Sequence, residues 1–407
     1  MSICGIVAEY NPFHEGHAYQ ISEIKRQGAK EVIVVMSSSF VQRGEVAILP
    51  PRVRAKAALL GGADLVLAMP VLFSCAAAPS FAFGGIASLL ATGLVDEISC
   101  GSESGNLSSV MALARLLFQE SAPLKQALHA AQHHCFSFAQ AREQAVYTLA
   151  PTLAPLLRQP NDLLAVEYAK VLLRLAPHVP LHLIQRQGQG HNDCFHTGGF
   201  ASATTLREAL KQKDQPFLEN HIPPAALSVY RDALQKGQGP CATESLFSAL
   251  QYALRRSSAM DLSDILEVDH GLEHRIISLF ATASSWADIL ARLQTKHMPR
   301  SSLSRALVHI LLGITSLHLQ QVQHTKTVPY LRVLGVRREK RNLLSRLAAS
   351  STVPVITQVK PALSRLPSLA LQTLYLDLLA SDLQAMLYPN PAQRQCGQSL
   401  TEPLLVV

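Results

Sequence analysis

The first twenty residues constrain the fold more than any other stretch of this chain. An apolar run over residues 3–8 predicts a short buried strand, and Asn11-Pro12 ends it, because proline fixes φ and lacks an N–H. From His17 onward the apolar spacing becomes helical. His14 and His17, with Gly16 between them, therefore precede a helix N-terminus, which attracts anions. They predict a clamp for nucleotide phosphates, although a lone His-x-Gly-His is more often a surface pair.

Alternating strand and helix patterns continue after this unit. Residues 31–36 form a nearly continuous β-branched run, as expected for a parallel strand covered on both faces. Three further strands are predicted over residues 63–70, 95–103 and 180–184. This alternation predicts an α/β fold with a doubly wound parallel sheet, whose ligands bind at the carboxyl ends of the strands. His14, Arg43 and Gly101 all fall at such ends.

The composition changes beyond residue 213. Pro223-Pro224 and residues 237–240 mark a boundary, and most later segments have helical patterns. Residues 300–319 are predicted to form one basic amphipathic helix. We therefore predict two domains: a sheet domain over residues 1–215 and a mostly helical domain over residues 216–407.

The overall composition is that of a globular protein. The 407 residues are 48% hydrophobic and only 16% charged, which excludes a disordered chain. A net charge of +7 suits a polyanionic partner without requiring one. The seven cysteines are scattered singly with no CxxC pair, as is typical of reduced thiols in the cytosol.

One long uncharged stretch raises the question of a membrane span. Residues 65–95 carry no charged side chain and are long enough to cross a bilayer. Pro70 and Pro79 interrupt them, so we interpret them as a buried strand, a loop and a buried helix. No secretory signal is visible, because the first apolar run meets Glu9 at once. We expect a cytoplasmic protein without membrane association.

Several separated motifs, in the right order along most of the chain, resemble one family. They are Gly5-Ile-Val-Ala-Glu-Tyr-Asn-Pro-Phe-His-Glu-Gly-His17, Phe40-Val-Gln-Arg-Gly-Glu45, Gly62-Ala-Asp-Leu-Val66, Pro70-Val-Leu-Phe73, Cys100-Gly-Ser-Glu103, Pro160-Asn-Asp-Leu-Leu164, Ala201-Ser-Ala-Thr204 and Gly271-Leu-Glu-His-Arg-Ile276. On these motifs the chain resembles the bacterial tRNA(Met) cytidine acetate ligases of the HxGH nucleotidylyltransferase superfamily. The match is far more specific than a lone His-x-Gly-His.

The resemblance implies an activity. Such ligases activate acetate with ATP as acetyl-adenylate and then transfer the acetyl group to N4 of the wobble cytidine of elongator tRNA(Met). The resemblance also implies Mg²⁺ held mostly by the ATP phosphates. The sequence itself contains no HExxH, Cys/His array or acidic cluster, so we expect no metal site built from protein side chains.

The resemblance also implies the site residues. His14 and His17 are the catalytic pair that contacts the phosphates, Asn161 bonds the nucleotide, and Arg186 pairs with phosphate or stacks on adenine. The implied ATP site comprises Val7, Ala8, Glu9, Tyr10, Asn11, Pro12, Phe13, His14, Glu15, Gly16, His17, Ala18, Tyr19, Gln20, Gly101, Asn161 and Arg186. A second phosphate-binding segment is implied at Ser202, Thr204 and Arg207.

Structural alternatives remain open for several of these residues. Arg186 could cap a strand end, Asn161 has the context of an ordinary N-cap, and Gly101 could serve a tight turn. His191 and Asp193 could orient a substrate, but they are more typical of a solvated loop.

The prediction of a tRNA partner depends on basic residues in the second half of the chain. Those that could contact RNA phosphates are Arg300, Arg305, Arg332, Arg337, Arg338, Lys340, Arg341 and Arg346. A solvated helix face is the competing explanation. Two other functions are weighed against the ligase: an adenylyltransferase for a small phosphorylated acceptor, and a non-catalytic ATP-dependent RNA-binding protein.

The chain departs from the family pattern at a few positions. Ser39 replaces an asparagine, and Ala68 replaces an acidic residue. Pro51 lies in a segment where an aspartate and a lysine are usual. We expect any effect of these changes on acetate or tRNA specificity rather than on the ATP clamp.

Overall fold

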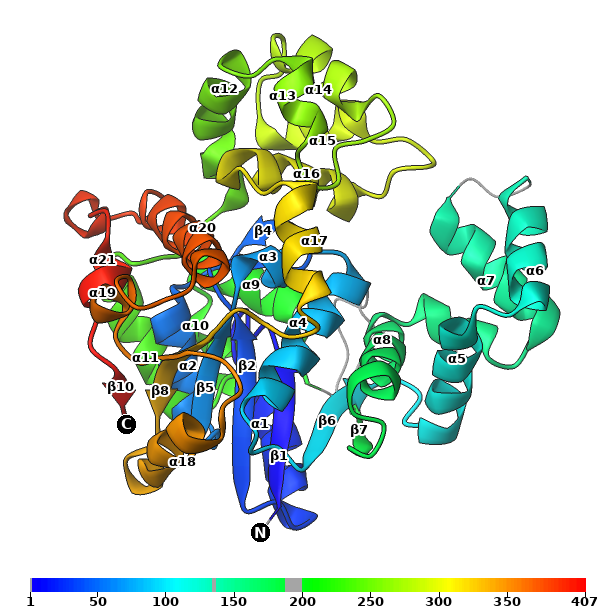
Figure 1. Cartoon of the computed structure of the whole chain (residues 1–407). Coiled ribbons are helices and arrows are strands. Elements are labelled where there is room, and N and C mark those ends of the chain that lie inside the picture. Colours follow the sequence, from blue (N-terminus) through cyan, green and yellow to red (C-terminus); the bar gives the residue numbers. More distant parts are fainter. Residues whose placement is uncertain (1, 134–136, 187–199) are drawn as a thin grey trace.

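The computed structural model describes residues 2–133, 137–186 and 200–407, and a mixed β-sheet forms its centre (Figure 1). In the described residues the sheet has eight strands in the order β10-β8-β5-β2-β1-β6-β7, with β9 beside β8. The strands are β1 (Ile3–Ala8), β2 (Glu31–Ser37), β5 (Leu65–Met69), β6 (Glu97–Ser102), β7 (Leu181–Gln185), β8 (Leu331–Val336), β9 (Val355–Ile356) and β10 (Leu405–Val406). A separate antiparallel hairpin joins β3 (Phe40–Val41) to β4 (Glu45–Val46).

The strand order reverses at β1. From β1 the chain adds β2 and then β5 on one side, and β6 and β7 follow on the other side, all parallel. The predicted doubly wound α/β class is therefore confirmed. In such sheets the crevice at the carboxyl ends of the strands flanking the reversal is the natural place for a ligand.

The second half of the chain extends this sheet. Strand β8 pairs antiparallel with β5, and both β9 and β10 pair parallel with β8. The sheet is mixed for this reason, and residues 331–336 belong to it although they lie beyond residue 215. The predicted boundary at 215/216 stays a prediction about how the chain divides.

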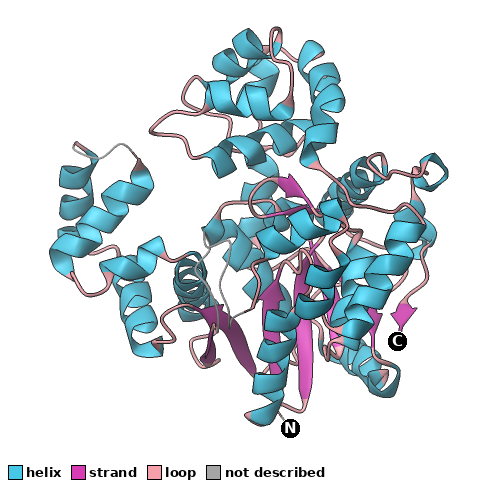
Figure 2. Cartoon of the chain, turned by 180° about the vertical axis from the view of Figure 1, so that it is seen from behind, coloured by secondary structure: helices cyan, strands magenta, loops and turns pink. Residues whose placement is uncertain are grey.

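Helices cover both faces of the sheet (Figure 2). On β2, Val32, Val34 and Met36 pack with one group of helices, while Ile33 and Val35 pack with another, as the two-residue period of a strand requires. The first group comprises α1 (Glu15–Arg26), α2 (Pro51–Leu60), α9 (Ala203–Gln212), α10 (Gln215–His221) and α11 (Pro224–Gln235). The second includes α3 (Val71–Ser74), α4 (Ala78–Ala91) and α8 (Pro160–Leu175).

Two helical parts extend beyond the sheet layers (Figures 1 and 2). One follows β6 and comprises α5 (Leu107–Gln119), α6 (Ala122–Gln132), α7 (Phe138–Leu149) and η1 (Ala154–Arg158). The other, called here the helical lobe, comprises η2 (Thr243–Leu246), α12 (Phe247–Arg255), α13 (Ala259–Ser263), α14 (Leu272–Phe280), α15 (Trp286–Leu293), α16 (Arg300–Leu312) and α17 (Ser316–His324). The remaining elements are η3 (Arg338–Lys340), α18 (Asn342–Ser350), α19 (Val359–Ala362), α20 (Ser368–Ala385), η4 (Pro391–Gln393) and α21 (Gln398–Thr401).

The prediction of one basic amphipathic helix over residues 300–319 is wrong. Helix α16 ends at Leu312, because Gly313 takes a left-handed conformation with φ of 62° and closes it. A new helix, α17, starts after the Thr315 cap. Most of α16 is buried, including Arg305 and His309, so it presents no basic face along its length.

The uncharged stretch over residues 65–95 contains β5, α3 and α4, which pack into the body of the protein. Among the described residues, no helix combines the length and the apolar character that crossing a bilayer would need.

Candidate active site

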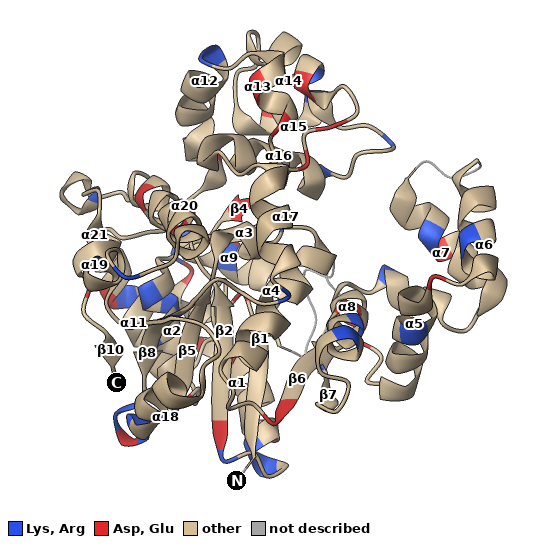
Figure 3. Cartoon of the chain, viewed as in Figure 1, with Lys and Arg blue, Asp and Glu red and all other residues tan. Residues whose placement is uncertain are grey.

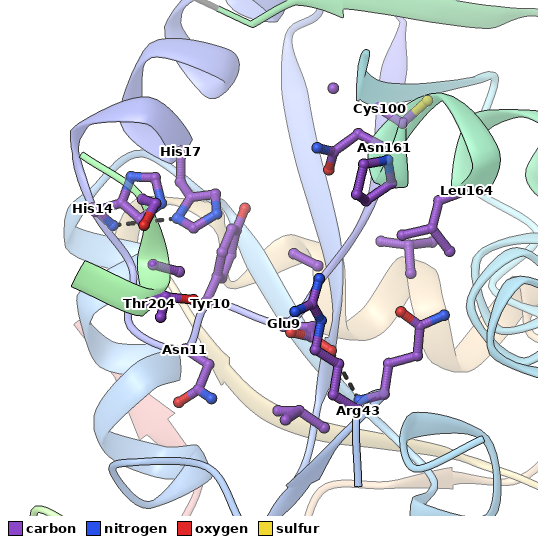
Figure 4. A pocket seen from close by; sticks show the side chains of 18 of the residues that line it. Glu9, Tyr10, Asn11, His14, His17, Arg43, Cys100, Asn161, Leu164 and Thr204 are labelled. Carbon is purple, nitrogen blue, oxygen red and sulfur yellow. Dashed lines mark hydrogen bonds between the residues drawn. The ribbon is translucent and has the colours of Figure 1, made fainter. Parts of the chain in front are cut away.

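A cavity of about 220 Å³ opens at the carboxyl ends of β1 and β6, where the strand order reverses (Figure 4). It is lined by Val7, Ala8, Glu9, Tyr10, Asn11, His14, His17, Gln20, Val41, Gln42, Arg43, Glu45, Phe81, Cys100, Gly101, Pro160, Asn161, Leu164, Tyr168, Arg186, Ser202, Ala203, Thr204 and Arg207. The topology therefore brings together segments that lie almost 200 residues apart in the sequence.

The first turns of three helices face this cavity. His14 and His17 lie at the start of α1, Asn161 at the start of α8, and Ser202 and Thr204 at the start of α9. The N-termini of α1 and α9 thus border one space with the positive ends of their dipoles, which favours an anionic ligand, whereas the first N–H groups of α8 are bonded by the Glu103 carboxylate.

The two histidines are locked into one local motif. The Nδ1 atom of His14 accepts a hydrogen bond from the Gly16 N–H at 3.1 Å, and the Nδ1 atom of His17 accepts one from the His14 N–H at 3.3 Å. Each neutral ring therefore carries its hydrogen on Nε2 and can donate from there. The ring centroids lie 3.8 Å apart. A Cβ at Gly16 would lie 3.0 Å from the His14 ring, so any larger residue there would press on the ring and require it to shift.

The segment between β1 and the histidines is fixed from several sides. Tyr10 has a φ of 45°, and the Asn11-Pro12 peptide is cis. The Asn11 Oδ1 accepts from the Ile48 N–H at 2.9 Å, and the Asn11 carbonyl accepts from Arg207 at 3.0 Å. The Tyr230 hydroxyl of α11 bonds both the N–H and the carbonyl of Phe13, at 2.9 and 3.2 Å.

Burial controls the charge of this site. It lowers the pKa of His14 to about 3, with smaller contributions from Arg186 and His221. Burial also lowers the pKa of His17 well below its usual range, and the neighbouring His14 adds to this. Both rings are therefore neutral at pH 7. Burial raises the pKa of the Glu9 carboxyl, which accepts a hydrogen bond from the Gln42 N–H at 2.8 Å.

Arginines outnumber carboxylates around the cavity by three to two. Arg43, Arg186 and Arg207 line it together with two carboxylates, Glu9 and Glu45. Arg207 lies 3.9 Å from Glu45 and also donates to Thr204 at 3.1 Å. Guanidinium groups match phosphate oxygens in shape and charge, so this set suits a polyphosphate.

Most residues implied by the sequence lie around this one cavity, but some do not. Gly16 and Tyr19 line a smaller adjoining cavity of about 40 Å³, together with Arg186 and Phe200. Outside the lining of both cavities lie Pro12, Phe13, Glu15 and Ala18. Phe13 is fully buried, and its ring centroid lies 5.0 Å from that of Tyr10 and 5.7 Å from that of His17, so it packs behind two residues of the lining. His191 and Asp193 lie outside the described residues.

The surroundings of Asn161 and Gly101 distinguish between their alternative roles. The Asn161 side chain donates to the Glu103 carboxylate at 2.6 Å, and Glu103 also accepts from the N–H groups of Asn161 and Asp162 at 3.2 and 2.9 Å. Glu103 is thus the residue that caps α8, and Asn161 is free to present its oxygen to the cavity. A Cβ at Gly101 would lie 3.6 Å from the Arg186 side chain, which is ordinary contact.

The implied ATP-site list leaves out the β3–β4 hairpin, which supplies Val41, Gln42, Arg43 and Glu45 to the cavity, although the strand pattern had placed Arg43 at a ligand-binding edge. The signal was present, because a polar turn follows the buried strand β2 and lies within a motif of the resemblance. Also absent from that list were Phe81, Cys100, Pro160, Leu164, Tyr168 and Ala203. In the residues that the structure describes, no group of three or more His, Cys, Asp or Glu side chains is placed to hold a metal ion.

The basic residues suggested for RNA contact differ from one another in burial and in their ion pairs. Lysine and arginine are spread over many elements of both halves (Figure 3). Arg305 and Arg332 are buried, and Lys340 and Arg346 pair with Glu31 at 3.2 and 2.6 Å. Arg305 also pairs with Glu267 at 2.8 Å, so Arg305, Lys340 and Arg346 are engaged in ion pairs within the protein. Exposed members of the set are Arg300, Arg338 and Arg341.

The departures from the family pattern gather away from the nucleotide-sized cavity. Pro51 and Ala68 line a separate cavity of about 40 Å³, together with Arg332. The Ser39 hydroxyl lies 3.5 Å from that of Ser381, which lines the same small cavity.

Comparison with known proteins places this geometry in a family. The profile of a family described as HIGH nucleotidyl transferase matches residues 1–399. A tRNA(Met) cytidine acetate ligase of Acetivibrio thermocellus is 30% identical over 415 aligned residues that cover all of both chains. One of Clostridium kluyveri is 32% identical, covering 100% of this chain and 99% of the relative.

Solved structures agree with these relatives. The crystal structure of Thermotoga maritima TmcAL bound with alpha-thio ATP matches with a TM-score of 0.91 and 27% identity, covering 100% of both chains. The apo form of the same protein matches with a TM-score of 0.93 and 28% identity, again over 100% of both chains.

Proposed function

The chain belongs to the HIGH nucleotidyl transferase family and, within it, to the tRNA(Met) cytidine acetate ligases, and we propose that it activates acetate with ATP to acetylate the wobble cytidine of elongator tRNA(Met). The observation that carries this proposal is the cavity at the sheet reversal, which is bordered by the N-termini of α1 and α9, a pair of neutral histidines and three arginines. This is an arrangement suited to a triphosphate. The ATP analogue in the Thermotoga maritima protein supports the choice of nucleotide.

The proposed first step joins acetate to AMP. An acetate oxygen attacks the α-phosphorus of ATP, the bond between the α-phosphorus and the bridging oxygen breaks, and pyrophosphate leaves. Acetate is already ionised at pH 7, so this step needs alignment and charge neutralisation more than a base. His14 and His17 would donate from Nε2 to phosphate oxygens, and Arg186 and Arg207 would neutralise negative charge.

The proposed second step moves the acetyl group. The cytidine N4 attacks the acetyl carbon, the bond from that carbon to the phosphate oxygen breaks, AMP leaves, and N4 releases one proton. Mg²⁺ would be held mainly by the triphosphate oxygens. The lining fits an ion that is held by the phosphates and not by the protein. Its charged groups are two carboxylates and three guanidinium groups, which do not form an acidic cage for a metal. We propose that the enzyme acts in the cytoplasm, with acetate, ATP and elongator tRNA(Met) as its substrates.

The test is incorporation of labelled acetate into tRNA. Purified protein, ATP, Mg²⁺ and radiolabelled acetate should label elongator tRNA(Met), and mass spectrometry of nucleosides should detect N4-acetylcytidine. A tRNA(Met) with uridine at the wobble position is the matched control and should stay unlabelled. Tight tRNA binding without label would contradict the ligase and support a binding protein. Pyrophosphate release that depends on another acceptor would support an adenylyltransferase.

A further inference from the structure

The β3–β4 hairpin lines the cavity on one side and rests on α16 of the helical lobe on the other. Its turn residue Gly44 has a φ of 73° and packs against the backbone of α16. A Cβ at Gly44 would lie 2.3 Å from the Arg305 nitrogen, so the two backbones touch with no space for a side chain. Glycine is required here both for its conformation and for this approach.

Side chains of α16 hold the backbone of this turn. The Ser304 hydroxyl donates to the Gly44 carbonyl at 2.7 Å, and the Arg305 guanidinium donates to the Gln42 carbonyl at 3.3 Å. On the cavity side, the Gln42 N–H donates to Glu9 at 2.8 Å. The peptide groups around Gln42 are thus held between the cavity wall and the helical lobe.

Helix α16 is itself held firmly. Arg305 is only 7% exposed, and its Nε donates to both oxygens of Glu267 at 2.8 and 3.0 Å. One turn later the ring nitrogens of His309 lie 2.9 Å from the Leu266 carbonyl and 2.7 Å from the Cys75 carbonyl. These contacts tie α16 to its own lobe and to the segment after α3. A displacement of α16 would therefore move the hairpin with it.

We propose that Arg305 and Ser304 are positioning residues of the nucleotide site. Through these two residues, the helical lobe fixes the positions of Gln42 and Arg43 relative to bound ATP. The inference rests on the proposed ATP site and adds a part of the chain that does not line it. Neither Arg305 nor Ser304 lines the cavity, so their effect on ATP passes through the hairpin backbone.

Two variants test this proposal. Ser304→Ala removes one hydrogen bond and keeps the packing. Arg305→Lys keeps a positive charge beside Glu267 but cannot reproduce the forked donors that also reach Gln42. The control is Ser350→Ala, which removes a hydroxyl bond of 2.7 Å from α18 to the Thr92 carbonyl, far from the hairpin.

We expect the KM for ATP to rise about three- to tenfold in Ser304→Ala and about tenfold or more in Arg305→Lys. The KM for acetate and for tRNA should change by less than about twofold. Ser350→Ala should lower the melting temperature without changing the KM for ATP. An unchanged KM for ATP in Ser304→Ala, or an equal rise in Ser350→Ala, would overturn the inference.

Direct binding separates this inference from the proposed function. Calorimetry with a non-hydrolysable ATP analogue, without acetate or tRNA, should show a loss of affinity in each α16 variant that matches its rise in the KM for ATP. If the wild-type protein binds the analogue but acetylates no tRNA, the proposed function fails and the comparison of affinities still decides the inference. If the variants bind as tightly as the wild type, the inference fails alone.

Discussion

At the scale of single residues, the histidine pair has two roles, one in capping helix α1 and one in the proposed phosphate site. His14 and His17 complete a capping box at the start of α1, which satisfies N–H groups that the helix leaves open. A second box of the same form joins Thr315 to His318 at the start of α17, away from the cavity. His318 is therefore an internal control for the helix-capping role of His17, because it caps a helix without lining the cavity.

His17→Ala should abolish acetyl-adenylate formation, by at least about 100-fold, while costing roughly 1 kcal/mol of stability through the lost cap. His318→Ala removes an equivalent acceptor, since its Nδ1 accepts from the Thr315 N–H at 3.1 Å. It should show the same small loss of stability with normal activity. Pyrophosphate exchange driven by acetate and urea unfolding measure the two effects. Retained exchange in His17→Ala would remove the phosphate clamp from the mechanism.

The buried pair should also shape the pH dependence of stability. The pKa of His14 is about 3 in the folded protein against 6.5 for an ordinary histidine. Below about pH 6.5 the unfolded chain binds protons that the folded chain excludes. The free energy of unfolding contributed by this group is therefore complete above about pH 6.5 and falls as the pH drops toward about 3.

His14→Asn tests this dependence, because asparagine is a good N-cap without a titrating ring. Urea unfolding between about pH 4.5 and 7.5 should give a shallower fall of stability in the variant than in the wild type. If the free energy of unfolding fell equally steeply with pH in the variant and the wild type, His14 would not be held neutral by burial.

At the scale of elements, α2 joins the strand ends that form the floor of the site. Arg54 of α2 is fully buried and donates to the carbonyls of Leu49, Glu9 and Ser37 at 3.0, 2.6 and 3.0 Å, and to that of Ser38. Burial lowers its pKa to about 10, so it stays charged at pH 7. One guanidinium thus satisfies carbonyls from β2 and from the segments after β1 and β4.

Arg54→Lys should lower the free energy of unfolding by roughly 3 kcal/mol, because a lysine ammonium cannot reach the same set of buried carbonyls. Arg52→Lys, on the same helix, is the matched control and should cost less than about 1 kcal/mol, since the Arg52 side chain bonds a single carbonyl among the described residues, that of Pro403 near the surface. Equal losses in the two variants, measured by chemical denaturation, would show that Arg54 is not the link between these segments.

At the scale of the whole molecule, the second half of the chain completes the first. Strand β8 covers the edge of β5, with Leu65 opposite Val336 and Ala68 opposite Arg332. Tyr230 supports Phe13 below the site. The predicted sheet domain therefore depends on later residues both for its sheet edge and for its active-site segment.

A fragment of residues 1–215 should neither unfold cooperatively nor bind an ATP analogue, because it exposes the edge of β5 and loses the support of α11 and α16. Thermal unfolding by circular dichroism and calorimetric titration measure these two properties against the full chain. A fragment that unfolds in one sharp transition and binds the analogue would support the boundary at 215/216 and contradict this expectation.

The parts of the site that could be predicted from sequence are those with local signals. Asn11-Pro12, Gly16 and the histidine pair lie within one strand–turn–helix unit, where proline chemistry and capping act over a few residues. The cap of α9 is an interaction of the same local kind, because the Ser202 side chain accepts from the Thr205 N–H three residues later. Glu103 as the cap of α8 was not, because its partners Asn161 and Asp162 lie 58 and 59 residues away.

The sequence by itself determined the α/β class and the membership in a ligase family, and it predicted a site at the carboxyl ends of the parallel strands, because strand and helix periods, turn residues and ordered motifs are local properties of the chain. Only the tertiary structure decided that β8 completes the sheet, that Arg305 is buried rather than presented to RNA, and that α16 holds the β3–β4 hairpin. Those outcomes depend on contacts across more than 250 residues, such as that of Ser304 with Gly44, and side-chain burial at such distances leaves no periodic trace in the sequence.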